Sequence, residues 1–394
     1  MSDQPRRRGV WGQPLQAGIT IAFVGYTSSF AVVIAGLRAV GASPAQATSG
    51  LVAVAVATGL VTWWLTWRTR MPLTAAWSTP GAAVLVSTGA VDGGWPAAVG
   101  AFAVTGGLIL LTGLWPLLGD LIARIPAPIA QATLGGVVLE LCLAPVRAMA
   151  THPWEVAPIL LTWLVLLRPF PRWAIPGAFM TTLAVLAVLA ARDGGVDGPW
   201  LPHPEWTTPH LGWAAVVGLA LPLYVVTMAG QNVPGAAIVA SFGFRTPWRE
   251  SMTVTGLGTL ACAPLGGHAV NLAAISAAVP ASAEAHPDPA ERWRASAAYG
   301  GTAIVLGLLT TALTGLIAGA PVAVISTVAG LALLGTLGGS VATALSDPGE
   351  RTAATVTFVI AASGTTIAGV GAAFWALVGG LVVRALLRPG ATTG

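Results

Sequence analysis

The sequence PLGGHAVNLAAISAA at residues 264–278 decides the fold. It is apolar, yet it is too short to cross a bilayer, which takes about 20 helical residues. Two glycines precede His268 and Asn271, which a helix would place one turn apart on one face. We therefore expect a short helix from His268 to Ala278 that begins inside the membrane.

A second stretch, TAAWSTPGAAVLV at residues 74–86, has the same design. Residues 72–77 are expected to be extended, and Ser78, Thr79, Pro80 and Gly81 then open a short helix over residues 78–87. Two broken helices in corresponding positions of two halves indicate the binding site of a transporter. We expect both helix starts to face a third element, MAGQNVPGA at residues 228–236.

The composition indicates an all-α polytopic membrane protein. Of 394 residues, 55% are hydrophobic and 8% are charged, whereas a soluble domain has about 25% charged residues. The apolar runs are continuous, which excludes the alternating pattern of a β-barrel. The net charge of +4 does not indicate nucleic-acid binding, because the arginines lie between the spans. Cys142 and Cys262 lie inside apolar segments and are expected to be small buried residues without a disulfide.

The apolar segments predict 14 transmembrane segments in two sets of seven. The first set covers residues 15–40, 44–67, 78–87, 95–118, 125–148, 158–167 and 174–191. The second set covers residues 211–240, 248–263, 268–278, 295–318, 322–344, 353–368 and 370–387. The halves, residues 1–205 and 206–394, would form one transport domain. An odd number of segments per half makes them an inverted repeat.

Arginine placement supports this topology. With the N-terminus in the cytoplasm and both short helices counted as spanning, only Arg38, Arg147 and Arg192 face outside, and the other fifteen of the 18 face inside. This is the bias of the positive-inside rule. Leaving out either short helix would invert the following loops and remove the bias. Both termini are therefore expected in the cytoplasm.

The residues at the helix breaks predict an anion site. A helix that begins at mid-depth offers unpaired N–H groups and the positive end of its dipole. No arginine or lysine lies in these stretches, which favours a small aromatic or aliphatic carboxylate over a multiply charged anion. The predicted substrate-binding residues are Tyr26, Thr27, Ser78, Thr79, Gly81, Gln231, Asn232, Gly267, His268 and Asn271.

Several of these residues have a purely structural alternative. Gln231 and Asn232 precede a Pro-Gly pair and could form only a helix break with local hydrogen bonds. The Thr27 hydroxyl could bond within its own helix. His268 and Glu140 are the candidates for proton coupling, because histidine titrates near neutrality and carboxylates inside spans are functional candidates by default. The alternatives are a packing role for His268 and hydration of Glu140 near the outer surface.

Four motifs resemble the benzoate/proton symporter (BenE-type) family. They are AWSTPGAA at 76–83, QNVPG at 231–235, GGHAVNLAAISAA at 266–278 and EAHPDPAERW at 284–293. The similarity extends over essentially the whole chain and implies uptake of benzoate with a proton. It also implies the fold shared by nucleobase/cation symporters and sulphate-type anion transporters. In that fold the first four segments of each half form a core and the last three form a gate.

The resemblance has two departures. Related nucleobase carriers have glutamates on the eighth and tenth segments, where this chain has Gln231, Asn232 and His268, which argues against a nucleobase substrate. The family is expected to have a basic residue at the position of Glu140, so the resemblance gives this residue no role.

The sequence therefore predicts a secondary active transporter that moves a small aromatic carboxylate with a proton by alternating access. The alternatives are a carrier of another substrate class, such as a nucleobase or an inorganic anion, and a channel-like protein. The expected location is the bacterial inner membrane. The expected partners are benzoate, a proton and the lipid bilayer, with a homodimer as a candidate assembly and no nucleic acid. No catalytic constellation, cofactor or metal is expected.

Overall fold

Long apolar helices make up most of the chain. The computed structural model describes residues 12–115, 117–119, 125–192, 201–317, 321–367 and 370–387. Within these residues, eight helical stretches are long and apolar enough to cross a membrane. They contain α1 (Gly12–Ala39), α2 (Pro44–Thr69), α4 (Gly94–Leu114), α6 (Ala127–Thr151), α8 (Pro171–Arg192), the segment Trp213–Ser241, α14 (Trp293–Ile317) and α15 (Val322–Ala344). The predicted polytopic helical class is confirmed.

Shorter helices occupy the remaining predicted positions. α7 (Pro153–Leu167), α16 (Arg351–Ala362) and α17 (Ala372–Leu387) are apolar helices of fewer than 18 residues, and α12 (Trp248–Cys262) is a helix of 15 residues that also carries Arg249 and Glu250. α16 ends before the predicted boundary at residue 368, which lies outside the described residues. A count of fourteen crossing segments stays a prediction. Cys142 and Cys262 are buried and free, as expected.

Local capping fixes where a helix begins. The Ser43 hydroxyl accepts a hydrogen bond from the Gln46 N–H, and the Gln46 side chain accepts one from the Ser43 N–H. This reciprocal capping box satisfies two donors at the start of α2, with Pro44 suited to the first turn.

Two short strands pair near the middle of the fold. β1 (Ala75–Trp77) and β2 (Val270–Leu272) pair antiparallel, with Ala76 opposite Asn271. α3 (Thr79–Thr88) follows β1 directly. The extended lead-in and the first short helix are therefore as predicted.

The second short helix was predicted wrongly. The chain from His268 to Leu272 is extended, and it then forms a 3-10 turn, η4 (Ile275–Ala277), and a short helix, α13 (Ala278–Ala281). Pairing with β1 explains the difference, because it satisfies the backbone groups that a helix would otherwise have to satisfy within itself. His268 and Asn271 are consequently not one helical turn apart.

The eighth predicted segment contains two π-helical turns. It runs through α9 (Trp213–Ala215), η1 (Val216–Ala220), α10 (Leu221–Thr227), η2 (Met228–Asn232) and α11 (Val233–Ser241). Pro222 and Pro234 follow these π turns by two residues. Since proline has no N–H and excludes the carbonyl four residues before it, the wider turns accommodate the missing bonds. The second π turn carries Gln231 and Asn232.

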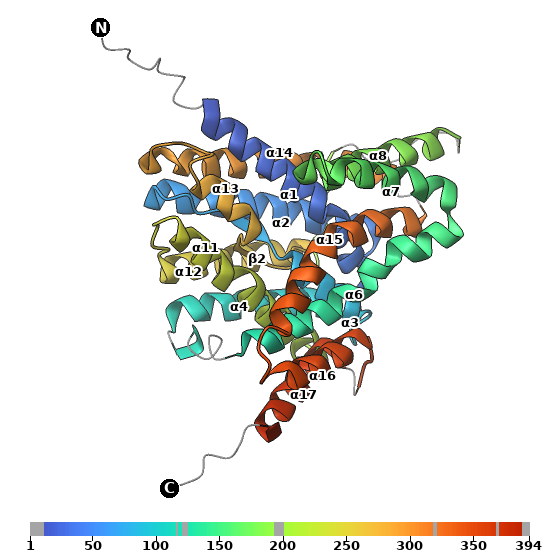
Figure 1. Cartoon of the computed structure of the whole chain (residues 1–394), viewed down its shortest axis with the longest axis vertical. Helices are drawn as coiled ribbons and strands as arrows, with labels where there is room; N and C mark the ends of the chain where they lie inside the picture. The colour runs from blue at the N-terminus through green and yellow to red at the C-terminus, as the bar shows by residue number, and fades with distance from the viewer. Residues whose placement is uncertain are drawn as a thin grey trace.

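Helices from the two halves of the chain pack in pairs. α2 contacts α14, α4 contacts α12, and α6 contacts α15. Some of these contacts require glycine: a Cβ on Gly256 in α12 would lie 2.5 Å from the Leu110 nitrogen in α4. In Figure 1, β2 and α15 lie near the middle of the molecule, with α1 and α14 on one side and α16 and α17 on the other. α7 and α8 pack against each other, as do α16 and α17.

Candidate functional site

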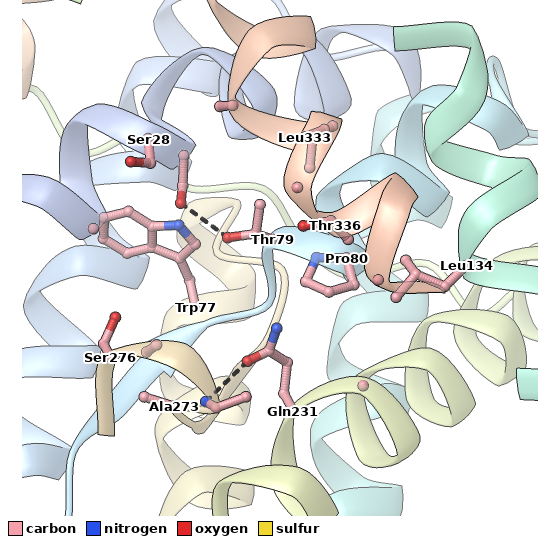
Figure 2. A pocket seen from close by; sticks show the side chains of 18 of the residues that line it. Ser28, Trp77, Thr79, Pro80, Leu134, Gln231, Ala273, Ser276, Leu333 and Thr336 are labelled. Carbon is pink, nitrogen blue, oxygen red and sulfur yellow. Dashed lines mark hydrogen bonds between the residues drawn. The ribbon is translucent and has the colours of Figure 1, made fainter. Parts of the chain in front are cut away.

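A cavity of about 490 Å³ lies at the start of α3, between α1 and α15 (Figure 2). The lining comes from α1, β1, α3, η2, residues 273–276 and Tyr299 of α14 on one side, and from α6 and α15 on the other. No charged side chain lines this cavity among the described residues. Apolar side chains such as Trp77, Leu134 and Leu333 alternate with polar ones. The polar lining residues are Ser28, Ser29, Thr79, Gln131, Gln231, Ser276, Tyr299, Thr336, Ser340 and Thr343.

The start of α3 presents Thr79 to the cavity and keeps Ser78 inside. The Ser78 hydroxyl caps the helix by accepting from the Gly81 N–H at 3.0 Å, and it also accepts from the Thr227 hydroxyl at 2.8 Å. The Ala82 N–H donates to the Ser78 carbonyl. Ser78 and Gly81 therefore hold the helix start, whereas the Thr79 hydroxyl lines the cavity and donates to Ser29 at 2.9 Å (Figure 2).

Gln231 and Asn232 are adjacent in the π turn η2, but their side chains have different surroundings. Gln231 lines the cavity, and its Oε1 accepts from the Ala274 N–H at 3.2 Å (Figure 2). Its amide nitrogen donates to no other residue in the described parts of the chain and can donate to a ligand. Asn232 is fully buried behind the wall, where its Oδ1 accepts from the Leu272 N–H at 2.7 Å. Gln231 can thus touch a ligand, while Asn232 anchors β2.

The residues of the predicted second helix stabilise the region where β1 pairs with β2. His268 is fully buried, and its Nε2 donates to the Ser78 carbonyl over 3.0 Å. The Asn271 amide oxygen accepts from the Ser78 N–H at 2.9 Å, and its nitrogen donates to the Leu272 carbonyl. The Gly267 N–H donates to the Cys262 carbonyl. None of these three residues lines the cavity.

The neighbouring polar residues 26–29 of α1 also differ in whether they line the cavity. Tyr26 is buried, and its hydroxyl hydrogen-bonds to Thr310 at 2.8 Å. The Thr27 hydroxyl donates to the Phe23 carbonyl within its own helix, which is the local alternative considered above. Ser28 and Ser29, one and two residues further on, line the cavity instead.

Glu140 lies apart from the cavity. Its side chain is exposed on α6 and forms an ion pair with Arg147 of the same helix. Of the ten predicted binding residues, the structure brings Thr79 and Gln231 to the cavity, and the others lie behind its walls.

Sequence reasoning missed the wall formed by α6 and α15. The Ser340 hydroxyl in α15 donates to Gln131 Oε1 in α6 at 3.1 Å, and both side chains line the cavity with Thr336. A glutamine inside the apolar run of residues 127–151 was the available signal. Whether this glutamine lines the cavity depends on which face of α6 packs toward α3, and a local sequence pattern does not determine that face.

Comparison with known proteins identifies the family. The family model described as benzoate membrane transport protein (BenE) matches residues 12–386. The chain belongs to the BenE family. This BenE chain is 39% identical over 378 residues to inner membrane protein YdcO of Escherichia coli (strain K12), covering 95% of each chain. It is 27% identical over 382 residues to the benzoate membrane transport protein of Acinetobacter baylyi, again covering 95% of each. The resemblance noted in the sequence is therefore confirmed.

Solved structures show that the BenE chain has the fold of anion transporters. The transmembrane domain of a cyanobacterium bicarbonate transporter, BicA, superposes with a TM-score of 0.60 at 16% identity and 98% coverage of both chains. The murine Slc26a9 anion transporter in its inward-facing state gives a TM-score of 0.67 at 12% identity, covering 98% of this chain and 69% of that one. The protein is a polytopic membrane transporter.

Proposed function

We propose that this protein is a secondary active transporter that takes up benzoate, or a similar small aromatic carboxylate, together with a proton across the bacterial inner membrane. The name of the Acinetobacter baylyi relative supports the substrate, and that of the Escherichia coli relative supports the membrane. The observation that carries the proposal is the uncharged cavity at the start of α3, which combines apolar and polar walls.

The cavity suits a monovalent aromatic acid. The positive end of the α3 dipole, the Gln231 amide nitrogen and the Thr79 hydroxyl, once it turns away from Ser29, supply donors for one carboxylate. Trp77, Leu134 and Leu333 supply apolar surface for a ring. Because no cation lines the cavity, a second negative charge on the ligand would be desolvated without compensation. This favours benzoate over a divalent anion such as sulphate.

The position of the cavity fits alternating access. We take residues 1–205 and 206–394 as two inverted repeats, with α1–α4 and the segments from α9 to α14 as the core. The helices α6–α8 and α15–α17 then form the gate. The cavity lies between α1 and α3 of the core and α6 and α15 of the gate. A shift of the core against the gate would expose it to each side of the membrane in turn.

His268 is the first candidate for the proton carrier, with Glu140 as the second. His268 donates to the carbonyl of Ser78, the residue that caps α3, so its protonation state would act on the helix start that faces the substrate. Glu140 is exposed and paired with Arg147, and it does not line the cavity.

Uptake by the purified protein in liposomes tests the proposal. An inward pH gradient should drive accumulation of labelled benzoate, and an uncoupler should abolish it. Excess unlabelled benzoate should compete, whereas uracil and sulphate should not. Competition by uracil or sulphate instead would assign another substrate class, and equilibration without accumulation would indicate a channel.

A further inference from the structure

A second cavity, of about 340 Å³, adjoins the central one beside the first half of α1. We call it the mouth cavity; it is lined by Gln13, Gln16, Ala17, Thr20, Ile21, Val24, Arg172, Val279 and Glu284. Ile21 and Val24 also line the central cavity. The two cavities therefore share lining residues on α1, and α8 contributes Arg172 to the mouth cavity.

The charges of the two cavities differ. Arg172, at the start of α8, is the only basic residue among the described residues that line either cavity. Its side chain is exposed, and no carboxylate lies within 4 Å of its nitrogens in the described parts of the chain. Glu284 lines the same mouth, and its carbonyl accepts from Gln13 Nε2 at 2.9 Å. The mouth thus holds an available guanidinium, while the central cavity holds none.

We propose that the mouth cavity is a transient binding subsite for the carboxylate of the substrate, with Arg172 as its cation. This inference rests on the proposed function, since it requires an anionic substrate. A guanidinium binds a carboxylate through two parallel hydrogen bonds and attracts it from several ångströms away. On uptake the substrate would pass from Thr79 and Gln231 along Ile21 and Val24 to the mouth cavity, because the predicted topology places Arg172 on the cytoplasmic side.

The neighbouring acid keeps such a subsite transient. Glu284 lines the same small cavity as Arg172 and carries a competing negative charge. The substrate anion would therefore be bound briefly at the mouth, and less tightly than in the central cavity. A subsite of this kind changes how fast the central site fills and empties, but leaves its equilibrium affinity unchanged.

The kinetics of benzoate binding to the purified full-length protein test the inference. Association and dissociation rates are measured by stopped-flow fluorescence at low and high ionic strength, and the dissociation constant is measured independently by calorimetry. Arg172→Gln should slow association and dissociation together by about tenfold at low salt, and the difference should shrink at high salt. Arg172→Lys should keep most of the rate. Arg168→Gln, which removes the same charge four residues away outside both cavities, should behave as the parent.

The outcomes separate the two proposals. Parental rates in Arg172→Gln, or equal slowing in Arg168→Gln, would overturn the subsite alone. A weakened equilibrium affinity in Arg172→Gln would place the guanidinium in the principal site and also overturn it. If the parent protein binds neither benzoate nor related aromatic acids, the proposed function is wrong and the subsite is wrong with it.

Discussion

Gln231 and Asn232 are neighbours in sequence with different contacts. Gln231 lines the cavity, so we predict that Gln231→Ala weakens benzoate binding by about 1–3 kcal/mol, the range for losing a hydrogen bond to a charged group. This corresponds to roughly a 5- to 150-fold rise in the dissociation constant. Calorimetry on the purified variant measures it. Unchanged affinity would remove Gln231 from the site.

Asn232→Ala should act on stability instead. Removing Oδ1 leaves the buried Leu272 N–H without its acceptor, which costs about 1–3 kcal/mol. We expect a lower thermal unfolding temperature in detergent than for Gln231→Ala. Should Asn232→Ala unfold like the parent while binding benzoate poorly, the side chain would be a direct ligand in another conformation.

Proton coupling can be assigned by a pair of variants. We predict that His268→Gln keeps part of its benzoate binding, since glutamine can also donate to the Ser78 carbonyl. It should nevertheless lose accumulation driven by an imposed pH gradient, because glutamine does not titrate. Glu140→Gln is the matched control and should accumulate benzoate as the parent does, because Glu140 is exposed and paired with Arg147. The reverse pattern would exchange the roles, and two active variants would leave His268 as a packing residue.

At the scale of elements, close contacts between helices of the two halves depend on glycine residues, which have no side chain. A Cβ at Gly256 in α12 would lie 2.5 Å from the Leu110 nitrogen in α4, so Gly256→Ala should push these helices apart. We expect a loss of about 1–3 kcal/mol in unfolding free energy, as for overpacked cores. Gly107→Ala in α4 is the control, since a Cβ there meets nothing within 4 Å. Thermal unfolding of both variants compares them, and equal stability would contradict the contact.

At the scale of the whole molecule, the arginine distribution predicts the orientation. A reporter fused after Arg388 should be cytoplasmic, and one inserted near Gly198 should be external, because fifteen of the 18 arginines then face inside. Both positions lie outside the described residues. Accessibility of the two reporters in intact cells measures this. Finding both on one side would contradict the scheme of seven plus seven segments.

The sequence predicted the class of the molecule and the start of α3 better than the contacts between distant segments. Long apolar runs and the Ser78–Pro80 helix start are local signals, and both were read correctly. The extended course of His268 to Leu272 depends on pairing with β1, about 195 residues earlier, so a local pattern of apolar residues suggested a helix instead. The same limit applies to Gln131 and Ser340, whose place in the cavity wall depends on how α6 and α15 pack.

The pairing of β1 with β2 has a consequence for how this protein can diversify. The ladder hydrogen bonds join main-chain atoms, and the Asn271 side chain of β2 adds a hydrogen bond from the Ser78 N–H. Trp77 and Ala76 line the cavity from such a strand. Substitutions of Ala76 and Trp77, whose side chains take no part in the ladder, should therefore change the shape of the cavity while the pairing of the strands remains.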